Sequence, residues 1–212
     1  MERAAQRDAA EVLIVVGTIA AILWFGRGVF PGSDAVFAVV LLAILAYSHW
    51  RAHEGWRELG FRLDTFWPTI WLLVPAIVMG CILTWSASVS LRAFGSPPAE
   101  TLPNVLAVFV AFGIAQQYVM LGFIFKRMQR VAGARLAPTL TALLFALLHL
   151  PNLFLTTVTF VWGVVASYVY RRSPNLWANG LVHGLMSAWV CYALPPSVTH
   201  GLRVGMEYLG LS

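Results

Sequence analysis

Long runs of apolar residues, separated by short polar segments, cover almost the whole chain. A helix that crosses a bilayer needs about 20 predominantly apolar residues. Seven runs approach or exceed this length, at residues 11–30, 33–50, 67–90, 103–125, 136–151, 153–170 and 175–195. The pattern therefore predicts an all-α fold, a polytopic bundle of about seven transmembrane helices with the lipid bilayer as its main partner.

The polar segments predict how the chain is divided. Residues 1–102 are expected to form N-terminal transmembrane helices, 103–195 the core helices and 196–212 a C-terminal tail. Segment 51–66 fits either a short amphipathic helix on the cytoplasmic face or a solvated loop. Segment 92–103 is rich in proline and small residues, which indicates an external turn. The first run has no small-residue cleavage site after it and is expected to be a retained signal anchor.

The distribution of basic residues predicts the orientation. With the N-terminus in the cytoplasm, 11 of the 14 lysines and arginines fall in cytoplasmic segments and 3 fall outside. The cytoplasmic ones are Arg3, Arg7, Arg51, Arg57, Arg62, Lys126, Arg127, Arg130, Arg135, Arg171 and Arg172, and the outer ones are Arg27, Arg92 and Arg203. Cytoplasmic loops are enriched in lysine and arginine. We therefore expect a cytoplasmic N-terminus and an external C-terminus, in the inner (plasma) membrane of a bacterium.

Composition supports this class of protein. Hydrophobic residues make up 59% of the chain and charged residues only 11%, whereas soluble domains carry about 25% charged residues. The net charge of +5 is spread over short clusters between apolar runs and leaves no basic face for a phosphate backbone, which argues against nucleic-acid binding. Cys81 and Cys191 lie inside apolar runs and are expected to be small buried hydrophobes, not a disulfide.

Polar side chains recur inside three of the predicted spans, where they are costly and mark functional sites. In chain order they are Gln116, Gln117, His149, Asn179, His183 and Ser187. The last three recur every four residues and so share one helical face. With a rise of ~1.5 Å per residue, Gln116, His149 and His183 all lie ~12–18 Å from the inner side of a ~30 Å hydrocarbon core. We expect the three helices to bring these groups to one buried pocket.

Two motifs in this region resemble those of the CAAX prenyl protease 2 and bacteriocin-processing family of intramembrane proteases, also called CPBP or Abi. The family pattern is Glu-Glu-x-x-x-Arg on one helix, Phe-x-x-x-His on the next and His-x-x-x-Asn on a later one. Phe145-x-x-x-His149 matches the second motif fully, and His183-x-x-x-Ser187 matches the third except at its last residue. The resemblance covers roughly residues 103–195.

The first motif departs from the family pattern. Gln116 and Gln117 stand where the two glutamates are expected, and Leu121 stands where the arginine is expected. The resemblance implies hydrolysis of CAAX-type or other membrane peptides, with glutamate activating water. Glutamine cannot accept the proton that a general base must take, and without the acids a buried arginine has no partner. No acid lies deep in a predicted span, so only a histidine can serve as the base.

The resemblance and the predicted depths together define the expected site. The catalytic set is Gln116, Gln117, His149, His183 and Ser187, and the binding set is Phe145, Asn152 and Asn179. We expect no cofactor. We also expect no metal, because two histidines with amide oxygens form a poor zinc site.

Three functions fit these residues. The first is an intramembrane endopeptidase with His149 or His183 as base, in which the amides position water or stabilise the oxyanion. The second is a non-proteolytic descendant that binds or converts a lipid, a prenyl chain or a peptide tail in the same pocket. The third is a structural subunit whose polar residues only join helices, at about 1 kcal/mol each. The missing glutamates favour the second function over the first.

Overall fold

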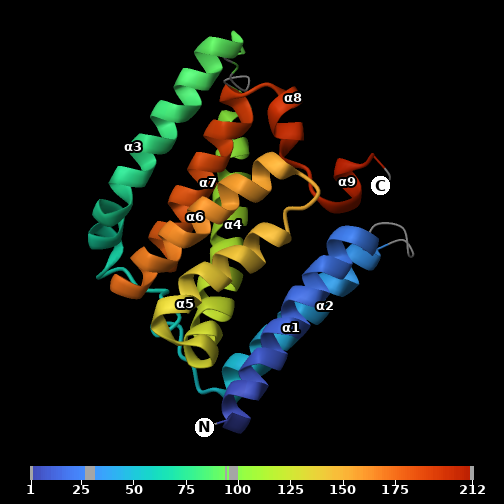
Figure 1. Cartoon of the computed structure of the whole chain (residues 1–212), viewed down its shortest axis with the longest axis vertical. Helices are drawn as coiled ribbons and strands as arrows, with labels where there is room; N and C mark the ends of the chain where they lie inside the picture. The colour runs from blue at the N-terminus through green and yellow to red at the C-terminus, as the bar shows by residue number, and fades with distance from the viewer. Residues whose placement is uncertain (1, 27–31, 94, 96–99, 211–212) are drawn as a thin grey trace. The chain divides into compact units, whose positions relative to one another are not determined.

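Helices make up nearly all of the described chain (Figure 1). The computed structural model describes residues 2–26, 32–93, 95 and 100–210. The long helices are α1 (Glu2–Phe25), α2 (Ser33–Arg51), α3 (Phe66–Leu91), α4 (Leu102–Gln117), α5 (Lys126–Leu147), α6 (Leu153–Arg172) and α7 (Leu176–Ala193). The shorter elements are the π-helix η1 (Tyr118–Phe125), α8 (Pro196–Thr199), the 3-10 helix η2 (His200–Leu202) and α9 (Gly205–Tyr208).

The predicted helical, multi-pass membrane fold is confirmed. Four stretches are long and apolar enough to cross a membrane, namely α1, α3, the continuous helical stretch Leu102–Leu147 and α6. Part of α2, Ala35–Arg51, is apolar but shorter. Each of the seven predicted spans overlaps a helix, and Leu102–Leu147 overlaps two of them. Large apolar side chains are widely exposed, as in Val39 and Leu83, which suits a surface in contact with lipid.

The chain forms two compact units. Unit 1 contains residues 1–55, 123–164 and 203–212. In it α1 packs against α2 and α5, and α9 packs against α1. Gly205 makes the last contact possible, because its φ is +56° and a Cβ there would lie 2.3 Å from the carbonyl oxygen of Leu23. Only glycine accepts both this backbone conformation and this close approach.

Unit 2 contains residues 56–122 and 165–202. In it α7 packs against both α3 and α4. The turn before α3 is fixed to the start of α7, since the backbone N–H of Leu176 donates to the carbonyl of Gly60 at 2.8 Å. The Tyr170 hydroxyl donates to the neighbouring carbonyl of Leu59, also at 2.8 Å. Unit 2 carries most of the residues predicted to form the site.

Segment 51–66 forms turns between the end of α2 and the start of α3, as its loop alternative predicted, although Leu59 and Gly60 are buried because they pack under α6 and α7. Two other predictions of local structure need correction. Residues 126–135 were expected to be a loop but are helical, with one break at Gly133, where φ is +78°. His149 lies in a turn just after α5 ends at Leu147, and not inside the helix.

Two predictions fall partly outside the described residues. The expected external turn 92–103 includes residues 94 and 96–99, and the end of the first predicted span includes residues 27–30. Cys81 and Cys191 are both free, and each is half-buried instead of fully buried as expected.

Candidate functional site

The site in unit 2 begins with the close approach of α4 and α7. Gly113 faces the backbone of α7, where a Cβ would lie 2.6 Å from the carbonyl oxygen of Gly180. On α7, a Cβ at Gly184 would lie 2.5 Å from the carbonyl oxygen of Phe109. Glycines at such positions let two membrane helices approach to backbone contact. Any larger residue would move the two helices apart and separate the side chains that they carry.

This close packing brings together two of the predicted site residues. The side-chain Nε2 of Gln117, the last residue of α4, lies 3.0 Å from Nδ1 of His183 on α7. Gln117 is fully buried and His183 is 8% exposed. An amide NH₂ group can only donate, so Nδ1 is the acceptor and the imidazole proton belongs on Nε2. Gln117 thereby fixes both the orientation and the tautomer of His183.

Asn179 lies one helical turn before His183 on the same face of α7. Its Nδ2 donates to the carbonyl of Asn175 at 2.7 Å, and Asn175 in turn caps the helix by accepting a hydrogen bond from the N–H of Ala178 at 2.8 Å. Among the described residues, neither Oδ1 of Asn179 nor Oε1 of Gln117 has a hydrogen-bond partner, although both atoms are buried. A buried acceptor without a donor costs about 1–3 kcal/mol. The site therefore offers two acceptors to a group that can donate.

The other predicted residues of unit 2 are less constrained. Gln116 and Ser187 are half-buried, and within the described part of the chain no hydrogen bond holds either side chain. Leu121, which replaces the arginine of the family motif, is fully buried in η1. A π-helix is uncommon and often marks a functional site, and η1 follows Gln117 directly.

Unit 1 holds the second predicted motif. The rings of Phe145 and His149 meet edge to face, with centroids 4.7 Å apart. Nδ1 of His149 donates to the carbonyl of Phe145 at 2.7 Å, because a carbonyl can only accept. When the ring is neutral, Nε2 is consequently its acceptor atom. The motif thus fixes this imidazole in the tautomer opposite to that of His183.

Asn152, predicted to bind a ligand, has a structural role in unit 1. Its Oδ1 accepts a hydrogen bond from the N–H of Leu155 at 3.1 Å, as an N-cap of α6 does. Its Nδ2 donates to the carbonyl of Arg203 at 3.0 Å. Gln117 and His183 belong to unit 2 and His149 to unit 1. That all three helices form one pocket stays a prediction.

A buried ion network in unit 1 was missed by the sequence analysis. Arg127 is completely buried, with its guanidinium carbon 3.7 Å from the centre of the Phe123 ring. It donates to Glu11 at 3.0 Å, to Ser48 at 2.7 Å and to Glu54 at 3.3 Å. The network joins α1, the end of α2 and the start of α5. It offsets the cost of burying the charges by satisfying their hydrogen bonds.

Glu54 is the most perturbed acid of this network. Burial on its own would raise the pKa of the Glu54 carboxyl, but the hydrogen bond with His49 and the charges of Arg127 and Lys126 lower it from 4.5 to about 2. The carboxylate oxygen lies 2.7 Å from Nδ1 of His49 and 3.3 Å from Arg127. Glu54 is accordingly ionised at physiological pH and committed to these partners.

One sequence feature could have revealed the close helix packing, whereas no sequence feature pointed to the ion network. Gly180 and Gly184 form a Gly-x-x-x-Gly pattern in an apolar segment, which is typical of close helix packing in membranes. The charges of Glu11 and Arg127 lie next to apolar runs but more than 100 positions apart. Spacing along the sequence carries no information about such a distant pair.

Comparison with known proteins gives one match. Residues 98–189 match the sequence model of a family described as type II CAAX prenyl endopeptidase Rce1-like. The match begins just before α4 and ends in α7, and so includes Gln117, His149 and His183. Neither the curated proteins nor the solved structures contain a match.

Proposed function

Since the chain belongs to the CPBP family of CAAX prenyl protease-like membrane proteins, we propose that it binds a lipid-modified or membrane peptide without glutamate-driven hydrolysis. The observation that carries this proposal is the 3.0 Å hydrogen bond between Gln117 and His183. In the family, a glutamate at the first position would take a proton from water, and an amide has no such capacity. The helices that carry most of the predicted site supply no substitute, because α3 through α8 contain no acidic residue.

The two buried acceptors without a partner support a peptide as the ligand. Oε1 of Gln117 and Oδ1 of Asn179 are buried acceptors, and buried acceptors normally have a hydrogen-bond donor as partner. A peptide offers a backbone N–H at every residue except proline, so a peptide tail can satisfy both atoms. The lipid or prenyl part of such a ligand needs only apolar surroundings, which the helices of the bundle supply. We infer that the ligand comes from the bilayer of a bacterial inner membrane.

A binding measurement tests this proposal. Purified chain in detergent micelles would be titrated with a fluorescent farnesylated C-terminal peptide and with its unprenylated form. Loss of one buried hydrogen bond is worth about 1.4 kcal/mol, so Gln117→Ala is expected to weaken binding about tenfold. Gln6→Ala removes an exposed amide on α1 and is the matched control. Equal affinity in all three proteins, or no binding at all, would refute a ligand site at Gln117.

A second function is favoured by the same contact. Because Gln117 holds the His183 ring in a defined orientation, His183 would serve as the base of a peptidase with Gln116, Asn179 and Ser187 as supporting groups. This function requires the imidazole to release its Nδ1 acceptor from Gln117, or to exchange its tautomer. It predicts peptide cleavage that disappears in His183→Ala, whereas the first proposal predicts no cleavage.

A further inference from the structure

A cluster of arginines lies where the turns before α3 meet the end of α6. Its members are Arg57, Arg62, Arg171 and Arg172. The side chain of Arg57 is 71% exposed, and Arg171 and Arg172 are exposed at the end of α6. The two pairs are more than 100 positions apart in the sequence. Their common location is therefore a product of the fold.

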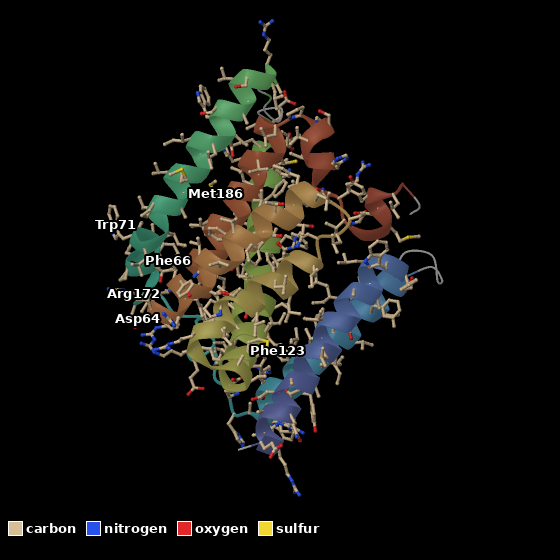
Figure 2. All side chains as sticks on the ribbon, in the orientation of Figure 1. Asp64, Phe66, Trp71, Phe123, Arg172 and Met186 are labelled. Atoms are coloured by element: carbon tan, nitrogen blue, oxygen red, sulfur yellow. The ribbon has the colours of Figure 1, made fainter. Side chains whose placement is uncertain are left out.

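Three hydrogen bonds join the segment at residues 62–69 to the segment at residues 173–175. Asn175 donates from Nδ2 to the carbonyl of Arg62 at 2.6 Å. The hydroxyls of Thr65 and Thr69 donate to the carbonyls of Pro174 and Ser173, each at 3.0 Å. Figure 2 shows the result, with Arg172 and Asp64 at the same corner of the unit. Since both Ser173 and Asn175 are buried, the backbone under the cluster is fixed.

The acids of the two segments only partly offset this charge. Asp64 is shared by Arg57 at 2.9 Å and by Nε of Arg62 at 2.8 Å, and its hydrogen bond with Arg62 lowers the pKa of its carboxyl to about 2. Glu58 is the only other acid in residues 56–66 and 171–175, so four positive and two negative charges leave +2. Arg172 has no hydrogen-bond or ion-pair partner within the described part of the chain.

Exposed apolar side chains border the cluster. Leu63 is 77% exposed, and Trp67 and Trp71, one turn apart on α3, are 68% and 72% exposed. Figure 2 shows Trp71 pointing outward from α3. Tryptophan is enriched where membrane proteins meet the head-group region of the bilayer. A positive cluster next to exposed tryptophans matches a ligand with a phosphate on one side and a hydrocarbon chain on the other.

We propose that Arg57, Arg62 and Arg172 bind the phosphate of an anionic phospholipid, whose glycerol and acyl region lies against Trp67 and Trp71. Arginine recognises phosphate through its planar fork of donors, and juxtamembrane cations attract anionic lipids. Free phosphate would use the arginines but would gain nothing from the apolar border. This lipid site uses other residues and other chemistry than the predicted site at Gln117, so it does not depend on the proposed function.

Native mass spectrometry of the full chain in detergent tests the proposal. The probes are dioleoyl phosphatidylglycerol, dioleoyl phosphatidylcholine and inorganic phosphate. The test variant is Arg57→Gln/Arg172→Gln, and the matched control, Arg92→Gln/Arg203→Gln, removes two exposed arginines elsewhere. We expect the test variant to bind phosphatidylglycerol about tenfold more weakly, with phosphatidylcholine binding unchanged, and the control variant to behave as wild type.

Other outcomes would overturn the lipid site. A similar loss in the control variant would mean that net charge alone attracts the lipid. Competition by millimolar inorganic phosphate would identify a site for the free anion. Should the double variant fail to fold, Arg172→Gln alone, which removes no hydrogen bond or ion pair between described residues, is expected to weaken phosphatidylglycerol binding about threefold. Unchanged binding in that variant would also contradict the proposal.

Discussion

The Gln117 amide donates a hydrogen bond to Nδ1 of His183, 3.0 Å away, across the contact between α4 and α7. Both side chains are buried. We predict that the neutral ring of His183 carries its proton on Nε2, which ¹⁵N NMR of histidine-labelled protein in micelles can detect. In Gln117→Glu the partner becomes an acceptor, so the proton is expected to move to Nδ1. A ring protonated on Nδ1 in the wild type would contradict the arrangement.

Close packing of α4 against α7 gives a second prediction. Gly184→Ala places a Cβ 2.5 Å from the carbonyl oxygen of Phe109 and 2.6 Å from Cα of Val110. Backbone atoms cannot yield as a flexible side chain can, so unfolding should become easier by about 1–3 kcal/mol. Unfolding in mixed dodecyl maltoside and SDS micelles measures this change. Gly17→Ala, where a Cβ meets no atom within 4 Å, should be nearly neutral, and equal effects in both variants would refute the close approach.

A third prediction concerns the buried Arg127. Arg127→Met removes the partner of Glu11 and Glu54 and leaves buried carboxylates with less compensation. Breaking a buried ion pair from one side costs about 3–5 kcal/mol. The same unfolding assay is expected to show a loss of this order. Arg135→Met removes an exposed arginine of the same helix, and a comparable loss there would show that burial is not the cause.

The ionisation of Glu54 predicts a pH dependence of stability. Its pKa is lowered in the folded protein from 4.5 to about 2, so the folded state favours the carboxylate. The corresponding stabilisation, at most about 3 kcal/mol, is complete above pH 4.5 and is lost as the pH falls towards 2. The difference in unfolding free energy between wild type and Glu54→Gln should shrink over this window. A difference that stays constant from pH 6 to pH 3 would contradict the network.

The sequence predicted the helices well because each is an apolar run with a definite length. It predicted less well where a single residue decides the local structure. The charged segment from Lys126 to Arg135 was expected to be a loop. It is helical instead, with one break at Gly133. Similarly, α5 ends at Leu147, which places His149 in a turn that apolar periodicity does not reveal.

The candidate site was predicted in part. Helical spacing put Asn179 and His183 on one face, and the structure adds that Gln117, but not Gln116, contacts His183. Neighbouring glutamines point in different directions from a helix, and spacing alone does not choose between them. The network around Arg127 was missed because it depends on contacts between residues that are far apart in the sequence.

A cleavage assay in detergent micelles tests the central claim most directly. Quenched transmembrane and prenylated C-terminal peptides would be incubated with wild type, His149→Ala, His183→Ala and Gln116→Glu/Gln117→Glu. Because α3 through α8 contain no carboxylate that could activate water, we predict no cleavage by the wild type and a gain of activity in the glutamate variant. Cleavage by the wild type that disappears in either histidine variant would contradict the account and establish a peptidase with a histidine base.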